Sequence, residues 1–504
     1  MNLFAIRDQA ADALRRGDLP GAIALLQWAI ERWPESLELY HDLAECRWSA
    51  YEFPEALAVY DEAFRVCAAS VVTCTLAAKK LFSIARFQDA ARWLLRALDL
   101  TPEDAPLLTQ LAEVYDRANQ LPDAERCALA ALELEPHHAR SVRILAHIER
   151  RRGRIDHAHR RLRNQMAMHP GPDDWRLRYE LGAILDQLGD YSSAMRELLL
   201  ARDQLRPQAL PFLHEAQSMR RRQLELAAQL SRADFESWRN GPPARGHTLS
   251  IALLCGHPRS GTTLLEQMLG MHDQVITTDE TGVLQREFIQ PILRDSPSAS
   301  DSAAELRSLD PDQLDAGRGA YRRFTEAHLG EPVGSRLLVE KDPALTPDLP
   351  LPLRLFPEAR VVFPLRDPRD VCLSYFFTLV PLAASSAAAL DLRSTCEFCA
   401  HSLALWTHWK ETLPHPLLET RYENLVTDPE QETRRVLEFL GLPWSPSLLA
   451  HHRRSAPRGV RTPTYADVAQ PVHSRAIGRW RNYEACLKPH LDILQPHLRS
   501  YGYD

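Results

Sequence analysis

The chain has 504 residues, of which 45% are hydrophobic and 25% are charged. This length is too great for one ordinary domain, and the composition is typical of a soluble globular protein, so we expect two or three domains. The formal net charge of −7 argues against unspecific binding to nucleic acid, although a local basic pocket is compatible with it.

Neither the start of the chain nor its longest uncharged stretch has the pattern of an export or membrane segment. Residues 1–18 alternate charged and apolar side chains and contain no apolar run of signal-peptide length. The uncharged stretch from Val371 to Leu390 contains a proline and several hydroxyl side chains. It therefore predicts a buried helix and a loop rather than a membrane span, and we expect a cytoplasmic protein.

The nine cysteines are scattered along the chain, which argues against a secreted disulfide framework. Cys396 and Cys399 form a single C-x-x-C without a second pair at metal-ligand spacing. We expect two packed thiols there, with a metal or redox role as the alternative. No metal site is predicted.

A period of 34 residues runs through the first half of the chain. Alanine recurs at this spacing, and a large apolar residue stands three positions before each alanine: Ala22, Ala56, Ala90, Ala124 and Ala158, after Leu19, Phe53, Phe87, Leu121 and Ile155. Two further series share the period: Pro34, Pro102, Pro136 and Pro170, with Ala68 in the place of a fifth proline, and Ala29, Ala63, Ala97 and Ala131, broken at Gln165. A sixth unit has Tyr191 and Ala194 displaced by two residues, which fits a short insertion.

This pattern predicts pairs of helices that stack into an α-helical solenoid over residues 1–205. A small alanine lets two helices approach closely, the large residue one turn earlier packs into the neighbour, and proline ends the second helix. The spacing resembles the tetratricopeptide repeat, whose unit has the same length. The resemblance implies a concave groove that binds a peptide or protein, with a structural spacer or a self-association surface as the alternatives.

Residues 206–248 are predicted to form a capping helix, at about Pro211 to Arg239, and a linker. The stretch from Asn240 to His247 interrupts the helical pattern with glycines and prolines. We place the start of a second domain there, and expect that domain to cover residues 249–504.

The second domain has the pattern of a parallel, doubly wound α/β sheet. Apolar runs bounded by turn residues are typical of buried strands, and they lie at residues 249–256, 336–340, 359–365 and 415–422. Helical patterns separate these runs, which favours parallel pairing. Ligands of such a sheet bind beyond the carboxyl ends of the strands.

The first strand leads into a loop with glycines at positions 256 and 261, the G-x-x-x-x-G spacing of a nucleotide-phosphate loop. Thr262 stands in the place of the lysine that a Walker A loop carries. Backbone N–H groups of residues 257–263 and the start of the next helix can face an anion. Arg259 adds a bidentate cation, and the hydroxyls of Thr262 and Thr263 add donors, so the loop is predicted to hold an anion.

A second anion site is predicted after the strand at residues 359–365. Arg366 follows this strand, and Ser374 comes eight residues later. If a helix begins near Pro368, Ser374 lies within reach of the strand end, and the pair suits another phosphate. The alternative is a surface cluster of ion pairs formed by Arg366, Asp367, Arg369 and Asp370.

Together, the two motifs resemble those of the sulfotransferase family, and the resemblance covers about residues 249–485. PRSGTTLLEQ is similar to the family's loop for the 5′-phosphosulfate of 3′-phosphoadenylyl sulfate (PAPS), and LRDPRDVCLSYF is similar to its 3′-phosphate motif. The resemblance implies a P-loop-like sulfotransferase fold with PAPS as cosubstrate and no metal. It assigns the 3′-phosphate to Arg366 and Ser374, and the 5′-phosphosulfate to Pro258, Arg259, Ser260, Gly261, Thr262 and Thr263.

The combination of repeats with this domain resembles a class of bacterial sulfotransferases, and the local motifs are most similar to those of protein-tyrosine sulfotransferases. Glu280 stands in the acidic-Glu-Thr context in which the tyrosine-directed enzymes carry their catalytic base. Lys341 matches the family's lysine that contacts the transferring sulfuryl group. With Arg259, it would stabilise the charge that builds on the leaving oxygen. The rival bases are Asp279, His257 and His272.

Other matches are less close. Tyr422 resembles the family's tyrosine near the nucleotide, and Arg479 stands where a cofactor-binding lysine usually lies. The hydroxyl of the closing segment falls at Thr464 or Tyr465, and both alternatives stay open. Thr378 occupies a position where the tyrosine-directed enzymes carry a further arginine, so the resemblance is weaker for the acceptor than for PAPS.

We therefore expect a PAPS-dependent sulfotransferase with an N-terminal repeat solenoid. A tyrosine in a peptide is the first choice of acceptor, because of Glu280 and because a repeat groove is suited to presenting a chain. A saccharide or small-molecule hydroxyl is the alternative. The rival classes are a P-loop kinase or NTPase, which requires a lysine at position 262, and a repeat scaffold with an inactive nucleotide-binding module.

Overall fold

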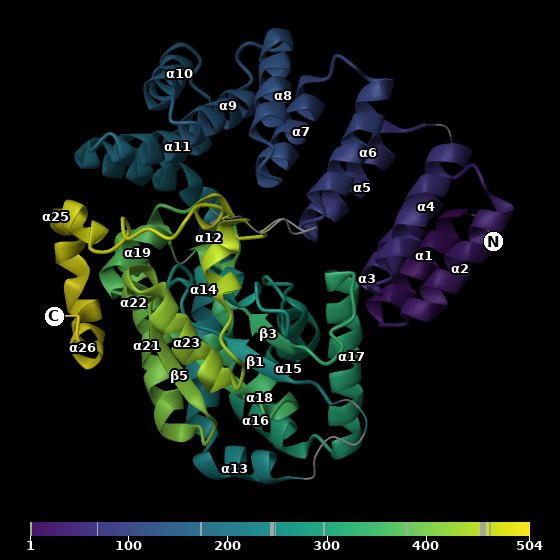
Figure 1. Ribbon diagram of the computed structural model, residues 1–504. Helices are drawn as coiled ribbons and strands as arrows, with labels where there is room; N and C mark the ends of the chain where they lie inside the picture. Colours follow the sequence, from purple (N-terminus) through teal and green to yellow (C-terminus); the bar gives the residue numbers. More distant parts are fainter. Residues whose placement is uncertain are drawn as a thin grey trace. The chain divides into compact units, whose positions relative to one another are not determined.

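The computed structural model describes residues 3–67, 69–171, 174–241, 246, 248–295, 298–379, 382–387, 389–453, 460–462 and 465–503. Ala68 and Thr464, both named above, lie outside these residues. The chain divides into two compact units, of which the first holds the chain up to Gln165 and the second holds most of the chain from Met166 onward. Figure 1 labels many elements of both units.

The first unit is built from helical pairs that repeat the predicted period, which confirms the tetratricopeptide-like solenoid. The pairs within its described residues are α1 (Leu3–Arg15) with α2 (Leu19–Arg32), α3 (Leu37–Ser49) with α4 (Phe53–Val66), α5 (Val71–Ser83) with α6 (Phe87–Leu100), α7 (Ala105–Arg117) with α8 (Leu121–Leu134), and α9 (Ala139–Arg151) with α10 (Ile155–Met168).

The turn inside each pair uses the same left-handed backbone conformation. A residue with positive φ follows the first helix of every pair: Gly17 at 78°, Tyr51 at 63°, Ala85 at 58°, Asn119 at 60° and Gly153 at 77°. Such a residue ends a helix and lets the chain reverse its direction. Gly189, at 80°, holds the corresponding place in a sixth pair, two residues later than the period, which confirms the predicted displacement.

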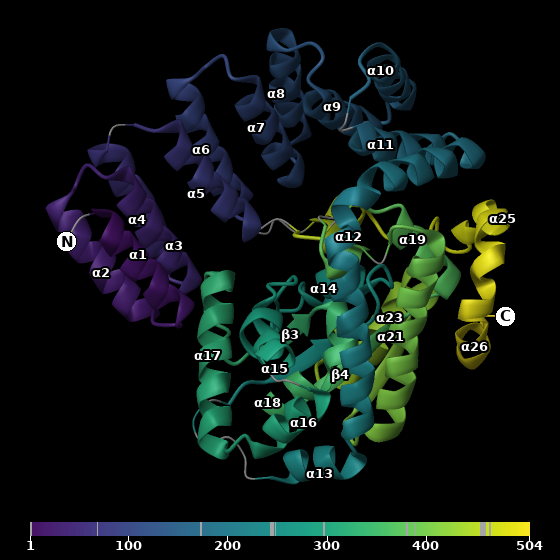
Figure 2. The same ribbon diagram turned by 180° about the vertical axis from the view of Figure 1, so that it is seen from behind.

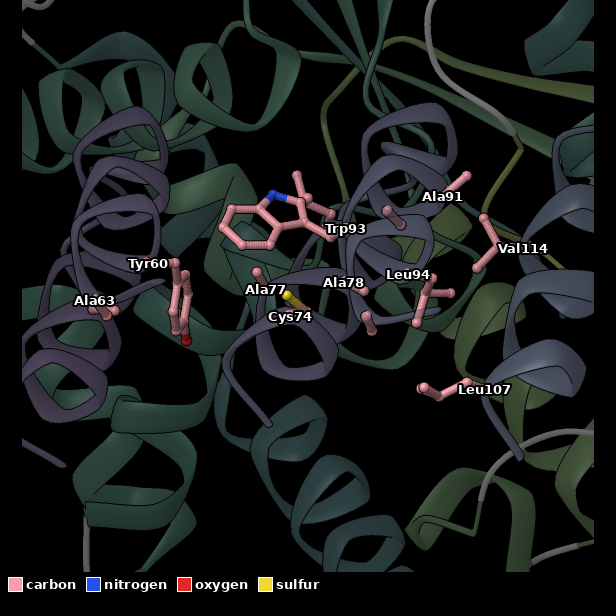
Figure 3. Packing of buried hydrophobic residues seen from close by; sticks show 14 of the residues in the cluster. Tyr60, Ala63, Cys74, Ala77, Ala78, Ala91, Trp93, Leu94, Leu107 and Val114 are labelled. Atoms are coloured by element: carbon pink, nitrogen blue, oxygen red, sulfur yellow. The ribbon is translucent and has the colours of Figure 1, made fainter. Parts of the chain in front are cut away.

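The periodic alanines are buried in the helical pairs. The first alanine of each second helix is fully buried, at 0% exposure: Ala22, Ala56, Ala90, Ala124, Ala158 and Ala194. Large side chains from successive pairs fill the space beside them. Figure 3 shows Tyr60 of α4 and Trp93 of α6 near Cys74 of α5, and the two rings lie edge to face with centroids 6.5 Å apart.

The sixth pair, α11 (Asp174–Gln187) and α12 (Tyr191–Gln229), belongs to the second unit. The expectation of a separate helix beginning near Pro211 is wrong, because α12 continues through Pro207 and Pro211 for 39 residues and a short α13 (Arg232–Asn240) follows it. Prolines cost backbone hydrogen bonds inside a helix, but burial of one face on both sides of them holds α12 together, at Leu205, Ala209 and Ala216. The predicted boundary after residue 205 lies inside α12, and the division into functional domains stays a prediction.

The second unit contains a five-stranded parallel sheet, which confirms the predicted α/β class. Its strands are β1 (Ile251–Leu254), β2 (Val275–Thr277), β3 (Leu337–Lys341), β4 (Arg360–Leu365) and β5 (Leu417–Arg421), in the spatial order β2-β3-β1-β4-β5. Leu253 of β1 stands opposite Glu340 on one side and Val361 on the other. The sequence did not reveal β2, because three residues are too few for a strand pattern.

Helices cover both faces of the sheet, as expected for a doubly wound fold. On one face, Leu265 of α14 (Thr262–Leu269) and Leu437 of α23 (Pro429–Leu440) share a hydrophobic core with strand residues such as Val362. On the other face, Phe363 of β4 stacks on Trp406 of α21 (Leu392–Thr412), with ring centroids 4.1 Å apart. Figure 2 shows α12 running beside α21.

The remaining α-helices, in chain order, are α15 (Gln290–Asp295), α16 (Ala299–Ser308), α17 (Pro311–Leu329), α18 (Pro350–Leu355), α19 (Pro368–Phe376), α20 (Ala384–Ala387), α22 (Tyr422–Thr427), α24 (Tyr465–Val468), α25 (Glu484–Leu487) and α26 (Leu491–Tyr501). None of the described helices is both long enough and apolar enough to span a bilayer. All nine cysteines are free thiols, and Cys396 and Cys399 are buried in α21.

Candidate active site

The predicted site residues follow the carboxyl ends of the strands. β1 leads into the loop at residues 255–261, β3 ends at Lys341, β4 is followed by Arg366, and β5 is followed by Tyr422. Glu280 comes three residues after the end of β2. Because all five strands are parallel, these residues meet at one edge of the sheet.

Two hydrogen bonds fix the start of the loop, whereas N–H groups at its end can bind a ligand. Thr346 Oγ1 donates a hydrogen bond to Gly256 O at 2.6 Å and accepts one from Gly256 N–H at 2.9 Å. The prediction that successive N–H groups of residues 257–263 face an anion is wrong at two positions, because Pro258 has no N–H and Ser260 donates its N–H within the loop at 3.1 Å. The N–H groups of the first turn of α14 remain as donors, since they have no acceptor within the helix.

Gly261 lets the ring of Tyr422 lie against the loop. The glycine has a φ of 101°, and a Cβ at this position would stand 2.6 Å from Tyr422 Cδ2. Arg259, two residues earlier, also has a left-handed backbone, with a φ of 77°. Two such residues so close together turn the chain sharply into the start of α14, a geometry that gathers N–H groups into an anion-binding concavity.

The two predicted anion motifs form one site. Arg259 Nε donates to Ser374 Oγ at 3.0 Å, and Arg366 Nη1 donates to Arg259 O at 3.0 Å. The Arg366 guanidinium lies 4.4 Å from the centre of the Tyr422 ring. Burial lowers the pKa of Arg259 from its ordinary value, but an arginine remains charged at any physiological pH.

The alternative was a surface cluster of ion pairs that includes Arg366. Within the residues that the structure describes, such pairing is found only for residues next to Arg366. Arg369 pairs with Asp367 at 2.9 Å, whereas Asp370 accepts the N–H groups of Gly478 at 2.6 Å and Trp480 at 2.8 Å. Among the described residues, Arg366 forms no ion pair, and it is 8% exposed. The arginine therefore faces the loop rather than a carboxylate.

Three polar atoms of the loop and of Arg366 are buried without a partner in the described part of the chain: His257 Nε2, Ser260 Oγ and Arg366 Nε. Buried polar groups are rarely left unpaired in a folded protein, and each costs free energy when it is. Ser260 Oγ and Arg366 Nε can donate to the oxygens of a phosphate or sulfate group, whereas His257 Nε2 is an acceptor because Nδ1 carries the proton. The residues present therefore fit an anionic group with several acceptor oxygens.

Lys341 is completely buried at the end of β3, and its ammonium group is surrounded by carboxylates. Its Nζ lies 2.7 Å from Glu280, 3.1 Å from Glu266 and 3.7 Å from Asp279. Burial alone would lower the pKa of Lys341, but the three carboxylates outweigh burial and raise the pKa above its ordinary value. The lysine is therefore a permanent cation next to the loop.

Glu266 was not predicted from the sequence, and it holds two parts of the site together. It lies on α14, is 0% exposed, and accepts the Asp279 N–H at 2.7 Å while it pairs with Lys341. Burial raises the pKa of Glu266, although Lys341 opposes this effect. The sequence offers one signal for Glu266. It is a charged residue four positions after Thr262, in a helix that has no other charged residue and packs on the sheet.

The turn that carries Glu280 is strained. Asp279 and Glu280 have φ values of 50° and 56°, which non-glycine residues rarely adopt. The turn is held by Glu280 N–H, which donates to Lys341 O at 3.2 Å, and by Asp279 Oδ2, which accepts Arg461 N–H at 2.7 Å. Strained residues of this kind persist when the surrounding contacts determine their position, and they concentrate at functional sites.

The three carboxylates around Lys341 differ in how far each side chain is exposed to solvent. The side chain of Glu266 is fully enclosed, that of Asp279 is 18% exposed and that of Glu280 is 34% exposed. An acceptor group can therefore reach Glu280 most easily.

The two rival histidines are less suited to accept a proton. His257 Nδ1 lies 2.6 Å from Pro258 O and must donate to it, and burial lowers the pKa of His257 to about 4. His272 Nε2 lies 2.9 Å from Pro443 O, and its Nδ1 accepts the Gln274 N–H at 3.1 Å. Both nitrogens of His272 are therefore occupied.

One contact between the closing segment and the site comes from a residue that was not predicted. Thr462 Oγ1 lies 3.4 Å from Thr263 Oγ1 of the loop helix, whereas Tyr465 begins α24. Arg479 pairs with Asp186 of α11, with 2.9 Å between Nη2 and Oδ2, and lies over the Phe377 ring. Sequence reasoning missed Thr462 and Asp186, because their contacts join segments far apart in the chain.

Comparison with known proteins finds similarity to two families. Residues 252–446 match the model of the sulfotransferase family, and residues 7–66, 109–158 and 145–209 match that of the tetratricopeptide repeat. Protein-tyrosine sulfotransferase 2 of Gallus gallus is 30% identical over 280 residues, which cover 51% of this chain and 70% of that protein. The chain belongs to the sulfotransferase family. The matched family region includes the loop, Glu280, Lys341, Arg366 and Tyr422, and it ends before Arg479.

Two further similarities are to a bacterial protein and to a solved structure. An uncharacterized protein of Aquifex aeolicus is 26% identical over 332 residues, which cover 64% of this chain and 41% of that protein, so the chain spans less than half of this relative. The solved structure of a tetratricopeptide repeat protein from Parabacteroides merdae covers 38% of this chain and 76% of its own, with 20% identity and a TM-score of 0.32.

A first prediction concerns the contact between Gly261 and Tyr422. Gly261→Ala places a methyl group against the ring at a φ of 101°, whereas Gly334→Ala meets nothing within 4 Å at a φ of 63°. Both changes cost about 1 kcal/mol through the backbone. We expect Gly261→Ala to lower the free energy of unfolding in urea by more than Gly334→Ala does. Equal losses for the two variants would show that the ring does not rest on the loop.

A second prediction concerns the ion pair between Glu266 and Lys341. Glu266→Gln keeps the shape of the side chain but removes one of the carboxylates that compensate the buried charge of Lys341. Removing one partner of a buried ion pair costs up to about 3–5 kcal/mol, because the other charge loses its compensation. Urea unfolding at pH 7 should therefore show a larger loss in the free energy of unfolding for Glu266→Gln than for Asp273→Asn on the exposed surface. Equal losses for the two variants would contradict a stabilising ion pair between Glu266 and Lys341.

Proposed function

We propose that the chain transfers a sulfuryl group from PAPS to a hydroxyl acceptor. The observation that carries this proposal is the junction of the two anion motifs, in which Arg259 reaches Ser374 and Arg366 reaches the backbone of Arg259. One nucleotide with phosphate groups at both its 3′ and 5′ positions suits such a joined site better than two separate anions. The carboxylates around Lys341 lie directly beside it, on α14 and after β2.

In this proposal, residues 258–263 hold the 5′-phosphosulfate, and Arg366 with Ser374 holds the 3′-phosphate. The unpaired Ser260 Oγ and Arg366 Nε supply donors that the fold leaves open. Tyr422 contacts both Gly261 and Arg366, and it thereby holds the loop and the arginine in a fixed position relative to each other. No metal is needed to bridge the phosphates, because Arg259, Arg366 and Lys341 supply fixed positive charge.

The reaction is a single displacement at sulfur. The acceptor oxygen forms a bond to sulfur, the bond between sulfur and the bridging phosphate oxygen breaks, and the proton of the acceptor moves to the Glu280 carboxylate. Arg259 and Lys341 stabilise the negative charge that develops on the leaving oxygen, and because both are held in place they do so without rearrangement. The strained turn at Glu280 keeps the base in its position before the acceptor binds.

The acceptor in this proposal is a tyrosine in a peptide or protein. Several relatives are named protein-tyrosine sulfotransferases, and the preceding solenoid belongs to a class of repeat that presents a concave surface. We assign the binding of the peptide, or of a protein that delivers it, to this solenoid. A saccharide or small-molecule hydroxyl remains the alternative acceptor. The nine free thiols fit a reducing compartment, and we propose that the enzyme works in the cytoplasm.

Nucleotide-dependent melting tests the donor. Adenosine 3′,5′-bisphosphate, the desulfated product of PAPS, should raise the melting temperature of the full-length protein, because a ligand that binds only the folded state stabilises it. At a concentration 100-fold above its dissociation constant, the gain is about 2.7 kcal/mol. ATP with Mg²⁺ should produce little shift. A larger shift with ATP and Mg²⁺ would instead identify a P-loop kinase or NTPase.

Substitution of the proposed base tests the chemistry. Glu280→Gln should reduce sulfuryl transfer by about 10²- to 10⁴-fold, because the amide cannot accept the proton. The same variant should keep its stabilisation by adenosine 3′,5′-bisphosphate. Asp279→Asn, on the adjacent residue, serves as the matched control and should retain more activity. If Glu280→Gln stays active and Asp279→Asn does not, the neighbouring carboxylate is the base.

A further inference from the structure

The sixth helical pair, α11 and α12, shares a hydrophobic core with the predicted 3′-phosphate motif. Leu198 and Leu205 of α12 belong to the same buried cluster as Leu373 and Phe376 of α19. Those two residues flank Ser374 along α19. The cluster also includes Trp480 of the closing segment, so the pair packs on the helix that carries the proposed phosphate ligand and on the segment that carries Arg479.

Arg202 of α12 binds the end of α19. The arginine is 3% exposed, and its Nη2 donates to Phe376 O at 2.6 Å, while its guanidinium lies 4.7 Å from the centre of the Phe376 ring. Carbonyl groups in the last turn of a helix lack partners inside the helix and attract a cation. Among the described residues no carboxylate pairs with Arg202 and its Nε lacks a partner, so the Phe376 carbonyl is the hydrogen-bond acceptor for this costly buried charge. The contact therefore fixes the end of α19 two residues after Ser374.

Asp186 of α11 binds the closing segment. Its Oδ2 lies 2.9 Å from Arg479 Nη2, and its Oδ1 accepts the hydroxyl of Tyr483 at 2.6 Å. The Arg479 guanidinium also lies 4.4 Å from the centre of the Phe377 ring, directly after α19. A carboxylate that binds one edge of a guanidinium leaves other N–H groups of the arginine for a ligand.

The opposite side of the closing segment is tied to the 3′-phosphate motif itself. Arg366 Nη2 donates to Ala476 O at 2.7 Å, and Asp370 accepts the N–H groups of Gly478 and Trp480. The stretch from Ala476 to Tyr483 thus bridges the proposed phosphate ligands and the sixth helical pair. A shift of α11 or α12 would therefore move both Arg479 and Ser374.

We propose that Asp186 and Arg202 are positioning residues for the donor nucleotide, so that the last helical repeat forms one wall of the 3′-phosphate site. Arg202 sets the position of Ser374 through the end of α19, and Asp186 sets the guanidinium of Arg479. This inference rests on the proposed PAPS-dependent function and adds to it: the repeat series supplies part of the catalytic unit and is not only a binding module attached to it.

Binding of two nucleotides to the full-length protein tests the inference, since only one of them carries a 3′-phosphate. Calorimetric titration compares adenosine 3′,5′-bisphosphate with 5′-AMP for the unaltered protein and for Asp186→Asn and Arg202→Met. We expect the unaltered protein to prefer the bisphosphate, and each variant to lose roughly 10-fold or more of that preference while its affinity for 5′-AMP stays within about twofold. Matched controls on the outer side of α12 are Asp203→Asn and Arg206→Met, which should keep the preference.

Conservative variants separate positioning from simple loss of stability. Arg202→Lys keeps a cationic donor for Phe376 O and should recover part of the preference that Arg202→Met loses. If Arg202→Met does not fold, the nucleotide preference of Asp186→Asn, at the partly exposed end of α11, tests the inference. Asp186→Glu is then the conservative variant for comparison.

The possible failures are distinguishable. Equal loss of affinity for both nucleotides in Asp186→Asn and Arg202→Met would assign the two residues a structural role and overturn this inference. An unchanged preference in both variants would overturn it as well, while the proposed donor would stand. If the unaltered protein shows no preference for the 3′-phosphate, the proposed function fails, and this inference fails with it.

Discussion

The site depends on one buried positive charge, the ammonium group of Lys341 at the end of β3. An enclosed lysine is stable only when its charge is compensated, and three carboxylates provide this compensation from two different elements. Glu266 reaches the lysine from α14, and Asp279 and Glu280 reach it from the turn after β2. These ion pairs hold the turn in a backbone conformation that it would not otherwise adopt, and so they present Glu280 at the surface of the site.

Helix α14 links this carboxylate cluster to the anion site. Its first turn supplies unpaired N–H groups next to Arg259 and Gly261, and one turn later Glu266 lies under Lys341. The two halves of the proposed reaction, donor binding and proton removal, therefore rest on one eight-residue helix. A movement of this helix would disturb both halves together. Tyr422 and Arg366 close the anion half from β5 and β4, which explains why residues from five strand ends are needed.

Much of this arrangement could be predicted from the sequence, because periodic patterns and short motifs are local signals. The alanine period gave the helical pairs up to α10, and apolar runs bounded by turns gave β1, β3, β4 and β5. Glu266 could not be predicted, because a glutamate in TTLLEQML is typical of the polar face of an amphipathic helix. Only the packing of α14 shows that the Glu266 side chain points into the core. The contacts of Asp186 and Arg202 join segments that are far apart in the chain, and no local pattern records them. Pro211 suggested a helix start, but the buried face of α12 overrides the local effect of the prolines.

The most direct measurement of the central claim is transfer itself. The full-length protein is incubated with PAPS that carries radiolabelled sulfate, and with a peptide that contains a single tyrosine; the same peptide with phenylalanine in that place is the control. The account predicts label bound covalently to the tyrosine peptide, release of adenosine 3′,5′-bisphosphate in equal amount, and no label on the control. Absence of label from the peptide and from saccharide acceptors alike would contradict sulfuryl transfer to a hydroxyl group.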